Sequence, residues 1–179
     1  MLSTYSIDTS HFVMGCGFLG RIYGRTCRFV KTFSRRKCYN VLGAMDYVSK
    51  KVLTVVNDSY ITTSEVCNIL QKIADKYKGS EIHLVLDNAK YQKCQIVQEL
   101  AQQLHIQLEY ISPYSPNLNL IERLWKFVKG ELSLKYYDDF DAFQEKIDSI
   151  ISTSNNNKPK IDKLIGKGIR LFNIQVHHR

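Results

Sequence analysis

The stretch "IHLVLDN" at residues 82–88 decides the fold, because a continuous apolar run ended by an acid is typical of a buried central strand. Apolar residues recur at helical spacing before it, in residues 62–79, and after it, in residues 93–105. The second run places Ile96, Val97, Leu100 and Leu104 on one face. Residues 106–111, "IQLEYI", predict a further strand, so helices are expected to join parallel strands here.

The N-terminal third has a different pattern. Residues 5–13, "YSIDTSHFV", carry β-forming side chains around Asp8. Residues 39–58 divide into two strand-like runs separated by "SKK", which predicts a hairpin. We therefore expect an α/β fold with a mixed five-stranded sheet, antiparallel across its first three strands, then parallel, and flanked by helices.

The stretch "PYSPNLNLIERLW" at residues 113–125 predicts a turn followed at once by a third helix, capped by Asn117 or Asn119. Its buried stripe is expected to contain Ile121, Leu124, Trp125, Val128 and Leu132. Further on, "SNNNKPK" at residues 154–160 predicts a flexible break. The expected organisation is one domain over residues 1–152 and a C-terminal tail over residues 153–179.

Length and composition fit one globular domain, with 179 residues of which 44% are hydrophobic. The sequence contains no apolar run long enough to predict a membrane helix, and its first residues lack the pattern of a secretory signal. The five cysteines show no zinc-like spacing. We expect a cytoplasmic protein with no membrane partner.

Basic residues are concentrated in one part of the chain. Residues 20–51 hold nine of the 25 Lys and Arg residues and one of the 17 acids, which accounts for the whole net charge of +8. Such an excess, interleaved with aromatic residues, favours a polyanion such as nucleic acid over a merely solvated face. The residues expected to bind DNA are Arg21, Arg25, Arg28, Lys31, Arg35, Arg36 and Lys37.

Three acids occupy unusual positions. Asp87 ends the buried strand, at the edge of the sheet where open α/β folds place their sites. Glu122 lies in the first turn of a helix that follows a rigid double-proline turn. Asp8 interrupts a β-rich segment, although burying an unpaired acid costs free energy. The structural alternatives are a cap or turn for Asp87, a surface pair with Lys126 for Glu122, and the exposed face of an edge strand for Asp8.

Three carboxylates on separate elements are suited to a divalent metal. Mg²⁺ is a hard cation that prefers oxygen ligands and keeps waters that a substrate can replace. Two such ions activate a nucleophile and stabilise the leaving oxygen in phosphoryl transfer. Together with a basic surface for the phosphate backbone, these acids point to a nuclease-like chemistry.

The segments "LVLDNAKYQK" and "ISPYSPNLNLIERLWKFVK" resemble the catalytic domain of bacterial insertion-sequence transposases of the mariner superfamily. In this chain, as in much of that superfamily, 34 residues separate the second Asp, Asp87, from the Glu, Glu122. "IDTSHFVMGCGFLGRIYGR" and "YNVLGAMDYVS" resemble the family's first-Asp strand and the hairpin that follows it. The resemblance covers about residues 1–150.

The resemblance implies an RNase H-like fold in which Asp8, Asp87 and Glu122 are the catalytic metal ligands. Asn88 and the turn of Tyr114, Ser115 and Asn119 would shape the site. Two Mg²⁺ ions, for which Mn²⁺ substitutes, would support hydrolysis at the element's end and then attack of the 3′-hydroxyl on target DNA at a TA sequence. The implied partners are double-stranded DNA, as element ends and target, and a second copy of the chain.

Two departures from the family pattern stand out. Relatives commonly carry a helix-turn-helix region ahead of the first Asp strand, whereas Asp8 lies close to Met1 here. A separately encoded helix-turn-helix partner, a frameshifted fusion and a decayed copy are the three explanations. Thr9 also stands where many relatives have an acid, and it should point to the opposite side of the strand.

Two other functions compete with this expectation. The first is an inactive transposase remnant that only binds DNA through residues 20–51. The second is a phosphotransferase or phosphatase in which Asp8 is the nucleophile. The segment "IDTSHF" offers neither a second nearby acid nor a glycine-rich phosphate loop, which disfavours the second rival.

Overall fold

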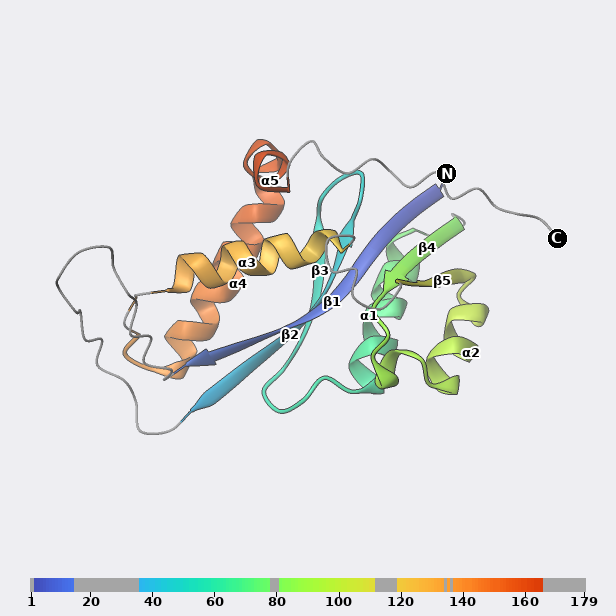
Figure 1. Cartoon of the computed structure of the whole chain (residues 1–179), viewed down its shortest axis with the longest axis horizontal. Coiled ribbons are helices and arrows are strands. Elements are labelled where there is room, and N and C mark those ends of the chain that lie inside the picture. The colour runs from blue at the N-terminus through green and yellow to red at the C-terminus, as the bar shows by residue number, and fades with distance from the viewer. Residues whose placement is uncertain are drawn as a thin grey trace.

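The computed structural model describes residues 2–14, 36–77, 81–111, 119–133, 135 and 137–165. Its five strands form one sheet in the order β3-β2-β1-β4-β5 (Figure 1). They are β1 (Leu2–Met14), β2 (Lys37–Asp46), β3 (Val52–Asn57), β4 (Glu81–Leu86) and β5 (Ile106–Tyr110). The pairs β1–β2 and β2–β3 are antiparallel, whereas β1–β4 and β4–β5 are parallel. The mixed sheet expected from the sequence is confirmed.

Strand β1 lies at the centre of the sheet and pairs with β2 along most of its length. Asp8 stands opposite Gly43 in that pairing. On its other side, β1 pairs with β4 only as far as Ser6 opposite Val85. The pairing between β1 and β4 therefore stops shortly before Asp8 on β1 and shortly before Asp87, which follows β4.

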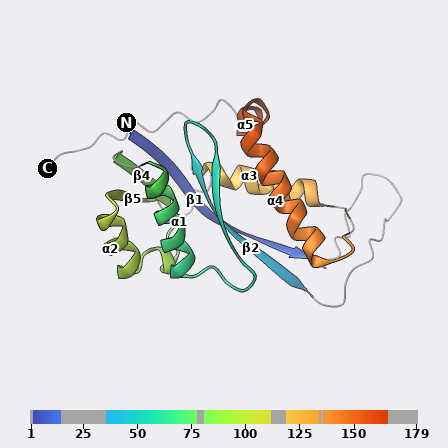
Figure 2. The ribbon, with the colours of Figure 1, turned by 180° about the vertical axis from the view of Figure 1, so that it is seen from behind.

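Helices cover both faces of the sheet. One face carries α1 (Thr63–Lys76), the short 3₁₀ helix η1 (Lys90–Gln92) and α2 (Gln95–Gln103). The other carries α3 (Leu120–Leu132), α4 (Phe140–Asn156) and α5 (Lys158–Ile165), as the opposite views of Figures 1 and 2 show. Thr62 and Glu65 form a capping box at the start of α1.

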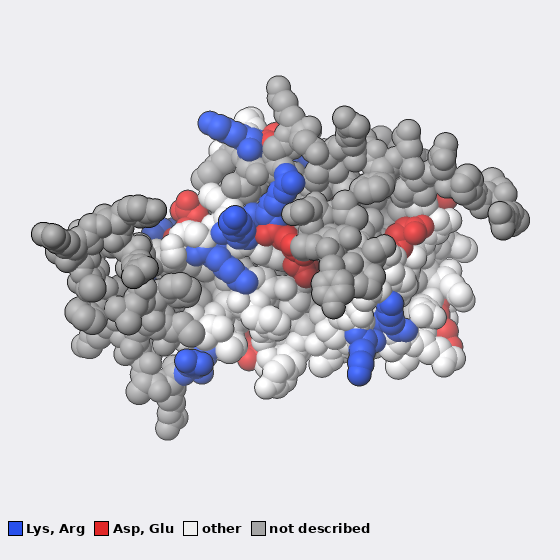
Figure 3. All heavy atoms as spheres, viewed as in Figure 1, with Lys and Arg blue, Asp and Glu red and all other residues white. Residues whose placement is uncertain are grey.

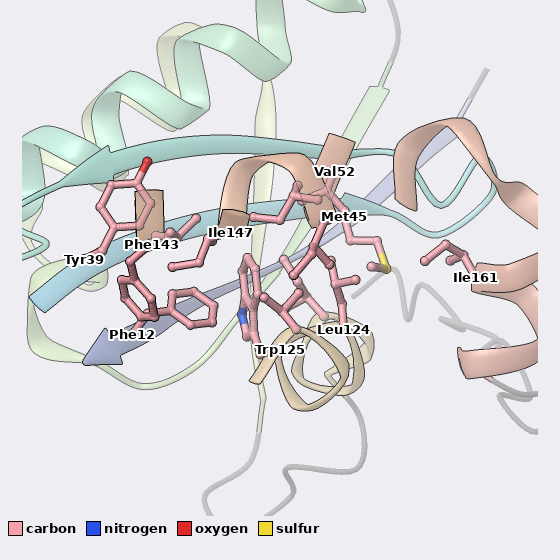
Figure 4. Close-up of a cluster of buried hydrophobic side chains, with 14 of the residues drawn as sticks. Phe12, Tyr39, Met45, Val52, Leu124, Trp125, Phe143, Ile147 and Ile161 are labelled. Atoms are coloured by element: carbon pink, nitrogen blue, oxygen red, sulfur yellow. The ribbon is translucent and has the colours of Figure 1, made fainter. Parts of the chain in front are cut away.

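Each face of the sheet has its own hydrophobic cluster, because successive strand residues point to opposite sides. Tyr5 and Ile7 of β1 pack with the apolar stripe of α1 and with α2. Phe12 of β1 packs on the other side with Trp125 of α3 and Phe143 of α4 (Figure 4). The stripe predicted for α3 is confirmed except at its end, since Leu132 is only partly buried against this second cluster and the other four predicted residues are buried in it. Strand β1 thus contributes to both cores.

Two local expectations are wrong. Ile96 is 62% exposed, and Val97 and Ala101 are the buried residues of α2. The asparagine-rich stretch at residues 154–160 is helical on both sides of Asn157, since α4 runs past residue 152 to Asn156 and α5 follows. Tertiary contacts override the weak helix propensity of this stretch, as the partners of Asn155 show.

Asn155 fastens α4 to the edge strand β3. Its Oδ1 accepts from Val52 N at 2.7 Å, and its Nδ2 donates to Val52 O at 3.0 Å. Farther along β3, Lys72 Nζ of α1 donates to Thr54 O at 2.9 Å. Side chains from two helices therefore satisfy backbone groups along this edge of the sheet.

No helix within the described ranges is both long and apolar enough to cross a membrane.

The turn between β2 and β3 is organised by the buried carboxylate of Asp46. It accepts from Val48 N at 2.8 Å, Ser49 Oγ at 2.7 Å and Tyr77 Oη at 3.1 Å. Burial alone would raise the pKa of Asp46, but these hydrogen bonds together hold it below its ordinary value of 3.8. A lowered pKa in the folded state means that the carboxylate stabilises the fold above that value and stops doing so at lower pH.

We expect Asp46→Asn to lower the free energy of unfolding at neutral pH by about 1–3 kcal/mol, since hydrogen bonds to a charged acceptor are lost. The difference between variant and parent should shrink as the pH falls below 3.8. Urea unfolding across this pH range measures both effects. Asp162→Asn, at an exposed position of α5, is the control; an equal loss in that variant would contradict the role of Asp46.

Candidate active site

Asp8 lies on the face of β1 that carries α3. Its neighbour Thr9 points to the opposite face, where its Oγ1 lies 3.3 Å from Tyr91 Oη. Ser6 and Ser10, which share the face of Asp8, are buried. Asp8 is only partly exposed, in the middle of the central strand. The alternative of a fully exposed strand face does not describe this position.

Glycine 43 allows α3 to approach the sheet closely beside Asp8. A Cβ atom at this position would lie 2.6 Å from Trp125 Cζ2 and 2.7 Å from Ile121 Cδ1. Real Cβ contacts are essentially never that short. Glu122 directly follows Ile121 in the first turn of α3. The missing side chain of Gly43 therefore lets the helix bring Glu122 toward the strand that carries Asp8.

Asp87 is held in a loop with its own supports. Its Oδ1 accepts from Ala89 N at 3.0 Å, which makes a local turn. Asn88 Nδ2 donates to Ile111 O just after β5, so the loop is fastened to the neighbouring strand. Asp87 thus follows β4 at the carboxyl edge of the sheet, as expected for an open α/β fold.

The ionisation of Asp8 and of Glu122 is influenced by the neighbouring acids. Burial is the main cause that raises the pKa of Asp8 to about 7. A hydrogen bond from Thr9 N lowers this pKa, the charges of Glu122 and Asp87 raise it, and Lys129 opposes them. Burial also raises the pKa of Glu122, and the charge of Asp87 adds to that effect. Elements far apart in the sequence therefore bring three carboxyl groups within electrostatic reach.

The donors of this site fit a hard divalent cation, because all three are carboxylates. Among the described residues, however, no three His, Cys, Asp or Glu side chains form a ready metal cluster. The charge of Asp87 nevertheless reaches both Asp8 and Glu122.

Cations accompany the acids. Lys129, two turns after Glu122 on α3, lies with Nζ 5.8 Å from the centre of the Phe12 ring and lowers the pKa of Asp8. Figure 3 shows acidic side chains near the middle of this face with basic side chains beside them. The site thus combines carboxylates for a metal with positive charge for a phosphate.

The other predicted site residues have varied outcomes. Asn119 is buried at the start of α3. Arg36 and Lys37 are exposed at the start of β2, and Lys37 Nζ lies 5.2 Å from the centre of the Phe140 ring. The remaining residues lie outside the described parts of the chain: Tyr114, Ser115, Arg21, Arg25, Arg28, Lys31 and Arg35.

Sequence reasoning missed two residues of this region. Gly43 interrupts a strand of large apolar residues, and an isolated glycine in a strand is a known sign of close backbone approach. Tyr91 lies near Asp8 and Asp87, whose charges contribute to its raised pKa after the larger effect of burial. No sequence signal distinguished Tyr91 from the chain's other tyrosines.

The family described as "DDE superfamily endonuclease" matches residues 17–144, which is more than half of the chain. The chain belongs to this family. The matched range contains Asp87 and Glu122 and begins after Asp8. A DDE endonuclease carries its chemistry on an RNase H-like sheet of this kind, so the fold and the class of enzyme agree.

Solved structures of the Mos1 mariner transposase share the fold of this DDE endonuclease domain. Its paired-end complex with Mn is 13% identical with a TM-score of 0.69, over 90% of this chain and 51% of that one. The Mos1 catalytic domain with raltegravir and Mn is 13% identical with a TM-score of 0.60, and the match covers 90% of this chain and 77% of that one. The chain spans about half the length of the transposase in the paired-end complexes. A comparison with curated proteins finds no match.

Substituting Gly43 tests the close approach of α3. We expect Gly43→Ala to lower the free energy of unfolding by about 1–3 kcal/mol, because the added methyl group overpacks the contact with Trp125 and Ile121. The matched control is Gly130→Ala on α3, where a Cβ would meet no described atom within 4 Å. That variant should be neutral or more stable by up to about 1 kcal/mol. Equal effects in urea unfolding would contradict the packing role of Gly43.

The raised pKa of Asp8 gives a second prediction, for the metal-free chain. Between 3.8 and about 7, the folded state keeps a proton that the unfolded state releases, so stability should fall as the pH rises through this window. Asp8→Asn removes this titration. We expect the variant to gain stability relative to the parent as the pH rises, as measured by urea unfolding with a chelator present. A difference that does not change with pH would contradict the raised pKa.

Proposed function

We propose that this chain is the catalytic domain of a transposase, which cleaves a DNA strand with divalent metal ions and transfers its end to a target. The observation that carries the proposal is the convergence of three carboxylates from separate elements: the charges of Glu122 and Asp87 both act on Asp8, and the charge of Asp87 also acts on Glu122. The match to the DDE endonuclease family and the fold shared with Mos1 transposase support the same hypothesis.

Asp8, Asp87 and Glu122 would hold the metal ions and are the proposed catalytic residues. When bound, two Mg²⁺ ions, or Mn²⁺ in their place, supply charge that activates the attacking oxygen and stabilises the leaving oxygen. Asn88, fastened to Ile111 O, would keep the loop of Asp87 in position. Tyr114 and Ser115 stay proposed members of the site.

The chain's cations would bind the phosphate backbone. Lys129 is placed to lie beside a phosphate at the carboxylates, because it already interacts with Asp8. Arg36 and Lys37 offer exposed charge at the start of β2. The further proposed contacts are Arg21, Arg25, Arg28, Lys31 and Arg35.

The finer features of the proposal follow from the resemblance to insertion-sequence transposases of the mariner superfamily. The substrates would be double-stranded element ends and a TA-type target, bound by a homodimer in the cytoplasm. Mos1 structures described as paired-end and strand transfer complexes support this assembly. A helix-turn-helix domain would recognise the end sequence, and residues 1–152 would form the catalytic domain followed by the tail at 153–179.

The test is nicking of supercoiled DNA in the presence of Mg²⁺ or Mn²⁺. We expect weak, nonspecific nicking by the parent chain and loss of nicking with a chelator. Asp8→Asn, Asp87→Asn and Glu122→Gln should each lower the rate by at least about a hundredfold, because bound metal contributes several kcal/mol to the transition state.

Glu131→Gln is the matched control for these variants. Glu131 lies on α3 like Glu122 but pairs with Lys135 at 3.9 Å, near the other end of the helix. It should nick at the parent's rate. Equal nicking by the parent and all three site variants would remove the acids from the mechanism, whereas DNA binding without metal-dependent nicking by the parent would favour the DNA-binding remnant.

A further inference from the structure

Asn119 occupies the cap position of α3 but directs its side chain elsewhere. Within the described part of the chain, that side chain makes no capping hydrogen bond to the helix. Its Nδ2 instead donates to Ile7 O at 2.9 Å, in a bond that is fully buried. Asn119 itself is only 3% exposed. A residue type that usually caps its own helix therefore joins that helix to a distant strand.

The accepting carbonyl belongs to the residue immediately before Asp8. Thr4 O accepts from Tyr47 N on the β2 side of β1. Because backbone groups alternate sides along a strand, Ile7 O points to the β4 side. Pairing with β4 has ended one residue earlier, at Ser6 opposite Val85. Asn119 thus supplies a donor at the point where the sheet opens between the two aspartates.

The main chain of Asn119 connects the same residue to the third acid. Its carbonyl oxygen accepts from Glu122 N at 3.3 Å, in the first turn of α3. One residue therefore contacts both the backbone next to Asp8 and the backbone of Glu122. Its Oδ1 is buried with no hydrogen-bond partner among the described residues. The Nδ2 group of the amide therefore makes the side-chain contact with β1.

We propose that Asn119 is a positioning residue that fixes the spacing between Asp8 and Glu122 and so sets the affinity of the site for divalent metal. This inference rests on the proposed function, because it assumes that both acids are metal ligands. Groups that orient metal ligands without touching the metal commonly affect affinity strongly. Asn119 meets that description through Ile7 O on one side and the first turn of α3 on the other.

The chain offers a matched control in Asn155. Its side chain also joins a helix to the backbone of a strand, through Val52 N and Val52 O, but on the edge strand β3. Loss of either asparagine removes a buried tie between helix and sheet. Only the loss of Asn119 should disturb the spacing of the acids.

The experiment measures Mn²⁺ binding to the metal-free chain by calorimetry, together with urea unfolding in a chelator. We expect Asn119→Ser and Asn119→Ala to bind Mn²⁺ about tenfold more weakly than the parent. Serine is a good helix cap but too short to replace the amide, so it keeps the start of α3 favourable. Asn155→Ala should keep the parent's affinity, and Asp87→Asn should lose binding.

The outcomes separate the two proposals. If both Asn119 variants bind like the parent while Asp87→Asn loses binding, the positioning role is overturned and the proposed function stands. Weakening by Asn155→Ala as large as by Asn119→Ser would mean that affinity follows general stability, which also overturns the role. If the parent binds no Mn²⁺, or Asp87→Asn binds as tightly as the parent, the proposed function fails and the inference with it.

Discussion

The contact between helix α3 and the pair of strands β1 and β2 is the constraint on which the site depends. Gly43 stands opposite Asp8, and the absence of its side chain lets Trp125 and Ile121 reach the sheet. Glu122 is carried toward Asp8 because it lies between these two residues on the same helix. An apolar packing contact thus determines the distance between two acids, although neither acid takes part in it.

Bringing acids together in this way is unfavourable in the metal-free chain. Burial and the neighbouring carboxylates both favour the protonated form of Asp8, and Lys129 offsets only part of this. The packing of α3 and the hydrogen bond of Asn119 to Ile7 O hold the elements in place despite that cost. The fold therefore stores electrostatic repulsion at the edge of its sheet, which a divalent cation would relieve.

The sheet and most helices could be predicted because periodicity, caps and the apolar run before Asp87 are local signals. The three acids were predicted as site residues because each occupies an unusual position in such a pattern. What could not be predicted depends on contacts between distant residues. The side chain of Asn119 bonds to β1 instead of its own helix, and Asn155 keeps a polar stretch helical through Val52. Neither partner can be identified from spacing along the chain.

The bonds of Asn155 and Lys72 to β3 also limit how copies of the chain can associate. Val52 uses both backbone groups on Asn155, and Thr54 O is taken by Lys72. A strand from another molecule would have to displace these side chains before it could add to this border of the sheet. Self-assembly by strand addition and fibril-like growth are therefore opposed at this part of β3.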